Sequence, residues 1–165
     1  MRLWHYKLLP YLPDAQFKGQ LRELVAIMRD WRDKETTNHL LINRVMEYPK
    51  DELVKYFLIY FHYYHSRYNK LIKPEIFKEF LAFNNYKYLI EIKNDKSEVD
   101  KGIFINMPNN EDIFEGWHNK QYLRVCLSNL YEKHHFGIGK SRITDEEWQV
   151  LLDGYKNITG EEYRI

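Results

Sequence analysis

The sequence predicts an all-α protein, and three features carry that prediction. Apolar side chains recur at intervals of three and four residues along several segments, which is the spacing of one helix face. Prolines and capping residues stand where these segments begin or end. The chain has 165 residues without an internal repeat, a length at which one domain buries roughly 70% of its unfolded surface. We therefore expect one compact domain, residues 1–165, of about five to six helices.

The first helix is expected to begin near Pro13, a residue suited to an opening turn, with Asp14 placed favourably against the helix dipole. One apolar stripe follows at alternating intervals of four and three residues. It consists of Phe17, Leu21, Leu24, Met28 and Trp31.

Proline and capping signals place the remaining helices. Pro49 ends one helical stretch and Pro74 opens another, while Thr144 and Glu147 form a capping-box pattern. Helices are thus expected over about 38–48, 51–71, 74–83 and 120–133, with a last one starting after Thr144. The segment 84–117 lacks this pattern and is expected to be rich in loops, with residues 86–92 forming a short strand or a helix end.

The composition limits the possible functions only loosely. The chain carries 25 Lys and Arg against 24 Asp and Glu, but residues 1–93 have a net charge of +5 and residues 94–165 one of −4. This asymmetry permits a basic nucleic-acid face on the N-terminal part. The single cysteine, Cys126, excludes an internal disulfide and is expected to be a small buried side chain. No apolar run approaches a membrane span, so we expect a cytoplasmic protein.

Polar residues of the first helix fall on separate faces when each residue is rotated by about 100°. The basic face holds Lys18, Arg22 and Arg29. A second strip holds Gln16, Gln20 and Glu23, and the small residues Gly19 and Ala26 lie between the two. This arrangement would let a phosphate backbone approach while a carboxylate stays available for chemistry. An ordinary solvated face explains the same pattern.

The histidines do not form a recognisable metal motif. His62 and His65 are three residues apart on a predicted helix, and His134 and His135 precede a glycine-rich bend. Zinc sites usually need three or four converging ligands, and no HExxH spacing is present. We expect no metal and no cofactor, with these side chains packing or lying at the surface. The aromatic helix around residues 56–71 is expected to belong to the core.

Three blocks of the sequence resemble the pyrimidine-dimer DNA glycosylase family, the phage-type endonuclease V that excises ultraviolet photoproducts. The first is Met1-Arg2-Leu3-Trp4, and the second is Gln20-Leu21-Arg22-Glu23-Leu24. The third runs from Gln121 through Lys133 and continues to Gly139-Lys140. The resemblance implies an all-helical fold in which the N-terminus is threaded between helices.

The resemblance also implies a mechanism without metal or cofactor. The α-amine of the terminal residue attacks the deoxyribose C1′ of the damaged nucleotide, and β-elimination through the resulting imine then breaks the strand. Carried over, Met1 supplies the amine and Glu23 the carboxylate. The expected DNA-binding residues are Arg2, Lys18, Arg22, Arg29, Lys133 and Lys140. The expected partner is damaged double-stranded DNA. We expect the protein to be a monomer that does not bind a membrane.

Some positions depart from the family pattern. Gln16 or Phe17 stands where the family has a histidine, and His134, His135 and Phe136 replace its paired tail aromatics. Because Arg2 is a long side chain, we expect Met1 to be retained. These changes preserve the amine and the carboxylate but alter the parts that recognise damage. A non-catalytic nucleic-acid-binding or adaptor protein on the same scaffold, and a metal-dependent nuclease, remain alternatives.

Overall fold

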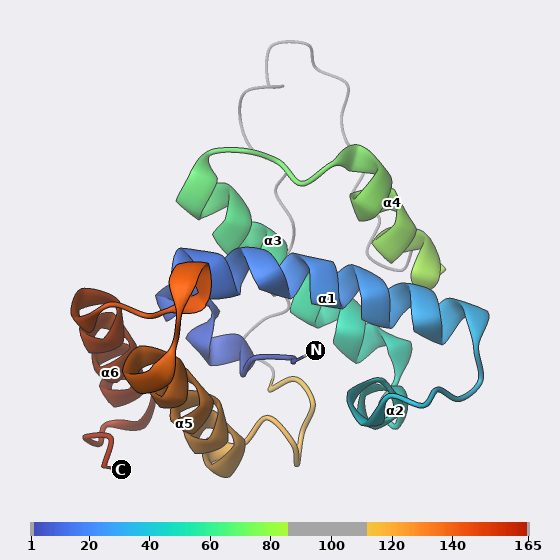
Figure 1. Cartoon of the computed structure of the whole chain (residues 1–165). Helices are drawn as coiled ribbons and strands as arrows, with labels where there is room; N and C mark the ends of the chain where they lie inside the picture. Colours follow the sequence, from blue (N-terminus) through green and yellow to red (C-terminus); the bar gives the residue numbers. More distant parts are fainter. Residues whose placement is uncertain (1, 86–111, 165) are drawn as a thin grey trace.

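A computed structural model describes residues 2–85 and 112–164, which form a compact all-α structure (Figure 1). This part of the chain contains six α-helices and two short 3₁₀ helices. They are η1 (Tyr6–Tyr11), α1 (Asp14–Asp33), α2 (Leu40–Met46), α3 (Lys50–Tyr68), α4 (Pro74–Phe83), α5 (Lys120–Phe136), η2 (Gly139–Ser141) and α6 (Asp145–Thr159). The predicted all-α class is confirmed. None of the described helices is long and apolar enough to cross a membrane.

The helix boundaries follow the proline and capping signals closely. Helix α1 begins one residue after Pro13, and α4 begins at Pro74 as expected. Helix α6 starts with a complete capping box: Thr144 Oγ accepts from the Glu147 amide at 3.2 Å, and the Glu147 carboxylate accepts from the Thr144 amide at 2.9 Å. Helix α3 ends three residues earlier than predicted, because Asn69 adopts a left-handed conformation with φ of 48°.

One hydrophobic core runs through the described part of the chain, and side chains of η1 and of all six α-helices contribute to it. The predicted stripe of α1 faces this core: Phe17, Leu24 and Met28 are buried, and Leu21 and Trp31 pack against them. The aromatic helix α3 is also confirmed as core. Its fully buried side chains include Tyr56, Phe57 and Tyr60.

Helix α5 packs against α6, and both stand beside the beginning of the chain (Figure 1). Cys126 of α5 is buried as expected, and burial raises the pKa of its thiol to about 11. Helix α6 in turn packs on η1, where the ring of Tyr11 lies directly over Gly154. The η1 helix was not predicted, because Pro10 inside it suggested only a turn.

The chain before η1 passes between helices, which confirms the predicted threading. Leu3 and Trp4 are buried, with side-chain partners on α1, α3 and α5. Of the predicted loop-rich segment 84–117, residues 86–111, including the possible strand at 86–92, lie outside the described residues. Residues 112–118 are described, and they pack Ile113 and Phe114 into the core.

Candidate functional site

The beginning of the chain is fixed to α1 by two polar side chains of the strip that the sequence singled out. The Arg2 amide donates to Glu23 Oε2 at 2.7 Å. Gln20 Nε2 donates to the Arg2 carbonyl at 3.1 Å, and Gln20 Oε1 accepts from the Trp4 amide at 2.8 Å. Because residues 20 and 23 are three apart, they lie on one face of the helix. This face therefore holds both polar groups of the Arg2 backbone.

Tyrosines from two other helices bind the same segment. The Tyr56 hydroxyl of α3 donates to the Trp4 carbonyl at 2.8 Å, and the Tyr122 hydroxyl of α5 donates to the Leu3 carbonyl. Buried backbone groups need hydrogen-bond partners. Residues 2–4 belong to no helix, and side chains of three helices bind the amide and carbonyl of Arg2, the carbonyl of Leu3, and the amide and carbonyl of Trp4. This arrangement gives the start of the chain a fixed position.

A pair of buried histidines secures the next residues. His5 Nε2 donates to the His118 carbonyl at 2.9 Å, and His118 Nδ1 accepts from the Tyr6 amide at 3.3 Å. His118 Nε2 is buried with no partner among the described residues. Burial lowers the pKa of His5 to about 4 and that of His118 well below its usual value. Both rings are thus neutral at neutral pH.

These lowered pKa values predict a loss of stability in mild acid. In the unfolded chain a histidine takes up a proton below about pH 6.5, whereas folded His5 does so only near pH 4. Stability is therefore fully present above about pH 6.5 and falls as the pH drops toward 4. His5 alone accounts for up to about 3 kcal/mol of that loss. Urea unfolding at a series of pH values measures it.

The same unfolding series is measured for His118→Asn, the test variant, and for His62→Gln, its control. The asparagine oxygen can accept from the Tyr6 amide, so the first variant should keep the contact and weaken the pH dependence between 6.5 and 4. His62 is exposed, so its replacement should leave the pH dependence unchanged. Identical slopes in the wild type and His118→Asn would show that His118 does not contribute.

Glu23 is partly buried, and its two carboxylate oxygens differ in their contacts with the described residues. Burial raises the pKa of its carboxyl above the usual value, and the hydrogen bond from the Arg2 amide opposes that rise. Oε2 carries the Arg2 hydrogen bond, while Oε1 has no hydrogen-bond partner among the described residues. A carboxylate with a raised pKa and a free acceptor is suited to proton transfer and to stabilising nearby positive charge.

A pocket of about 640 Å³ opens beside the Arg2 side chain. Its other walls come from the end of α5 and from the bend that follows. They consist of Asn129, Glu132, Lys133, Phe136, Gly137, Ile138 and Ser141. Phe136 and Ile138 are 78% and 88% exposed, so the pocket has an apolar rim. The Arg2 guanidinium also lies 5.0 Å from the centre of the Trp4 ring.

Four of the six predicted DNA-binding residues have no ion-pair partner among the described residues. Arg2 and Lys133 meet at the pocket, and Lys140 lies exposed in η2, next to Ser141 of the pocket wall. Arg22 is exposed on α1 beside Gly19. Arg2 and Lys133 are half-buried, and cations without a carboxylate partner attract an anionic ligand such as a phosphate backbone.

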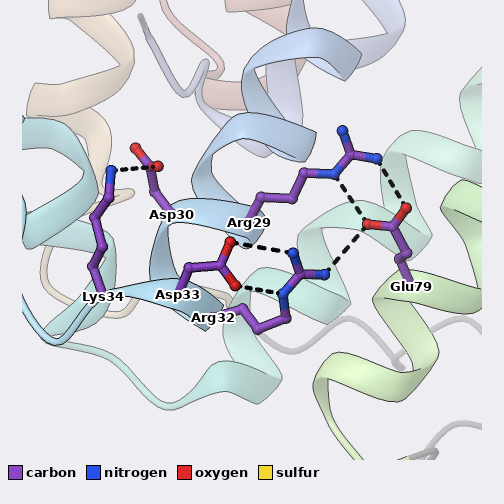
Figure 2. A network of polar contacts seen from close by, with 6 residues as sticks. All are labelled: Arg29, Asp30, Arg32, Asp33, Lys34 and Glu79. Atoms are coloured by element: carbon purple, nitrogen blue, oxygen red, sulfur yellow. Dashed lines mark hydrogen bonds and ion pairs between the residues drawn. The ribbon is translucent and has the colours of Figure 1, made fainter.

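The other two predicted DNA-binding residues, Lys18 and Arg29, form ion pairs with carboxylates of the chain. Lys18 forms an ion pair with Asp14 at 2.7 Å. Arg29 forms a bidentate ion pair with Glu79 of α4, in which Nη2 donates to Oε1 at 2.8 Å and Nε donates to Oε2 at 3.1 Å (Figure 2). Arg32 Nη1 lies 3.7 Å from Oε2 of the same carboxylate. Arg29 lies six positions after Glu23, about 9 Å along the helix axis. In this structure Arg29 ties α1 to α4.

Met1, the predicted source of the amine, lies outside the described residues. Two of the histidines that were considered as metal ligands are engaged in other contacts. His134 bonds to Asp145 at 2.8 Å, His135 packs on Tyr131, and no three His, Cys, Asp or Glu side chains gather into a metal site in residues 2–85 and 112–164. The contacts of Gln20 were not predicted, although its place on the strip with Glu23 was the available signal in the sequence.

These features define an all-α protein with a site at the start of its chain, where a half-buried carboxylate binds the backbone near a pocket that contains Arg2 and Lys133. Residues 1–73 match the family model of the pyrimidine dimer DNA glycosylase. The predicted family resemblance is thereby confirmed for that part of the chain, which includes Arg2, Gln20, Glu23 and Tyr56. The third block, Gln121 to Lys140, lies beyond it. Neither the comparison with curated proteins nor that with solved structures gave a match.

Proposed function

We propose that the protein is a DNA-repair glycosylase with abasic-site lyase activity, acting through the α-amine of Met1. Its substrate would be a duplex carrying an ultraviolet-type pyrimidine dimer or a related lesion. The observation that carries the proposal is the hydrogen bond from the Arg2 amide to Glu23. The family match over residues 1–73 supports a glycosylase.

Covalent geometry connects that hydrogen bond to the amine. In any polypeptide the nitrogens of consecutive residues are joined through three bonds and lie within roughly 4 Å of each other. A carboxylate bonded to the Arg2 nitrogen is thus held close to an amine at the preceding residue. An α-amine has an ordinary pKa of about 7.7–8.0, so a substantial fraction is unprotonated and nucleophilic near neutral pH.

The proposed reaction has two stages. The amine nitrogen forms a bond to C1′ as the glycosidic bond breaks, and the base leaves with the bonding pair and takes up a proton from solvent. The nitrogen loses a proton, and the C1′–O4′ bond opens as O4′ leaves with the bonding pair and takes up a proton to become a hydroxyl, which gives the protonated imine. Removal of a C2′ proton then leads to cleavage of the C3′–O3′ bond, with the phosphate as leaving group. Hydrolysis of the imine restores the amine.

The residues of the site have distinct roles in this proposal. Glu23 stabilises the positive charge that develops on the sugar and accepts protons. Arg2 and Lys133 hold phosphates at the pocket, while Lys140 and Arg22 supply further phosphate contacts outside it. Lys18 and Arg29 would contact phosphate only by exchanging their carboxylate partners. Access to C1′ requires the damaged nucleotide to leave the stack.

Borohydride trapping tests this function directly. The protein is incubated with abasic-site duplex and sodium borohydride in the presence of EDTA, which would remove any divalent metal. A covalent protein–DNA complex is expected, because the imine is reduced to a stable amine. DNA binding without any trapped complex would contradict the proposal and favour an adaptor. Strand cleavage abolished by EDTA would also contradict it and favour a metal-dependent nuclease.

A further inference from the structure

Gln20 is a fully buried amide that contacts the backbone of residues 2–4 and the Tyr56 hydroxyl of α3, which binds the same segment. Its Oε1 accepts from the Trp4 amide at 2.8 Å and from the Tyr56 hydroxyl at 3.1 Å, and its Nε2 donates to the Arg2 carbonyl at 3.1 Å. The Gln20 carboxamide thus binds the Arg2 carbonyl and the Trp4 amide, which lie two residues apart along the chain. In a β-sheet, a neighbouring strand binds the carbonyl and amide groups on one side of an extended chain in the same way.

The partners of residues 2–4 alternate in the way that extended backbone requires. The polar groups of Arg2 and the amide of Trp4 turn toward α1, where Glu23 and Gln20 bind them. The carbonyl of Leu3, the residue between them, is bound instead by the Tyr122 hydroxyl of α5. In an extended chain, successive residues present their amides and carbonyls to opposite sides. A shift of the chain by one residue would therefore break all of these contacts together.

We infer that Gln20 is a positioning residue, which sets the register of residues 2–4 on α1 and so places the terminal amine beside the Glu23 carboxylate. Glu23 binds the Arg2 amide and Gln20 binds the Arg2 carbonyl, so that the residue is held on both sides of its α-carbon. Without the carboxamide, the Arg2 carbonyl and the Trp4 amide would lose their partner on α1, although the two tyrosines would still bind the carbonyls of Leu3 and Trp4. The functional part of this inference rests on the proposed lyase.

Two replacements of Gln20 distinguish the effect of its hydrogen bonds on the register of residues 2–4 from the effect of its packing volume. Gln20→Met keeps the approximate volume but removes every hydrogen bond of the carboxamide. Gln20→Glu keeps the acceptor for the Trp4 amide and loses the donor to the Arg2 carbonyl until the introduced carboxyl is protonated. The matched control is Tyr60→Phe, which removes a buried hydrogen bond of 3.0 Å from α3 to the Phe17 carbonyl of α1. That bond belongs to the same helix pair but does not contact residues 2–4.

The trapping rate at saturating abasic DNA and the thermal midpoint are measured for each variant. Gln20→Met should lower the trapping rate by about 10–100-fold, since misplacement of a reacting group by about 1 Å can reduce a rate by about 10²-fold. DNA affinity should change by less than about threefold. Gln20→Glu should lose rate at neutral pH and regain part of it in mild acid, relative to wild type. A rate loss no larger than in Tyr60→Phe would overturn the inference.

The backbone amide resonance of Arg2 tests the positioning without reference to activity. In the wild type it should lie downfield and exchange slowly with solvent, because its proton is donated to a carboxylate. Gln20→Met should move it upfield and speed its exchange, whereas Tyr60→Phe should leave it in place. An unmoved Arg2 resonance in Gln20→Met overturns the inference. If the wild type traps no DNA, the proposed lyase fails, while this resonance still decides the role of Gln20.

Discussion

Replacing Glu23 with glutamine is expected to lower the rate of covalent trapping and strand cleavage by about 10²–10⁴-fold, the range typical of a general acid–base group. The introduced amide oxygen can still accept from the Arg2 amide, which Glu23 binds at 2.7 Å. The N-terminal segment should therefore keep its position, and only the negative charge and the proton acceptor are lost. Single-turnover trapping at saturating DNA measures the effect.

A control is needed because removing any acidic charge strengthens attraction to DNA. Glu35 is exposed just beyond the end of α1, and Glu35→Gln makes the same change of charge away from the site. Its trapping rate should equal that of the wild type. DNA affinity should be kept or slightly increased in both variants. A Glu23→Gln protein that cleaves at the wild-type rate would remove Glu23 from the mechanism.

Gly154→Ala is expected to have the largest effect on stability among the substitutions considered. A Cβ at this position would lie 2.4 Å from Cγ of Tyr11 and below 3 Å from two further ring atoms. Tyr11 ends η1, and α6 must either tilt away from it or displace the ring. Overpacking of this kind typically destabilises a protein by about 1–3 kcal/mol. Each kcal/mol lowers the melting temperature by about 2–4 °C in a protein of this size.

Gly19→Ala is the matched substitution for this experiment. Gly19 lies inside α1, and among the described residues a Cβ there would meet only the Arg22 guanidinium, at 3.8 Å. Alanine favours a helix interior over glycine by up to about 1 kcal/mol, so this variant should melt at the wild-type temperature or slightly above it. Equal melting temperatures for Gly154→Ala and the wild type would show that the contact between η1 and α6 is not tight.

Local signals in the sequence predicted most of the helices. Prolines and the capping box determine where a chain enters a helix, and these preferences act within one turn. Pro74 and Thr144 therefore located α4 and α6 correctly. The η1 helix was missed because Pro10 is compatible with a turn and with a 3₁₀ helix alike. The end of α3 depended on a left-handed Asn69, which the apolar pattern does not reveal.

The site was predictable only where its residues share one helix. The rotation of α1 correctly placed Gln20 and Glu23 on one strip, but it did not show that the strip faces the backbone of Arg2. Helix geometry gives the direction of a side chain and leaves its partner undetermined. Arg29 illustrates this limit, because its partner Glu79 lies 50 residues further along the chain.

The central claim is that the α-amine of Met1 forms the bond to DNA, and peptide mapping of the trapped complex tests it most directly. The reduced complex is digested and the peptide that carries the sugar remnant is sequenced by mass spectrometry. The proposal predicts the remnant on the Met1 nitrogen, and no trapped complex when that nitrogen is acetylated beforehand. A remnant on a lysine side chain, or trapping that persists after acetylation, would contradict it.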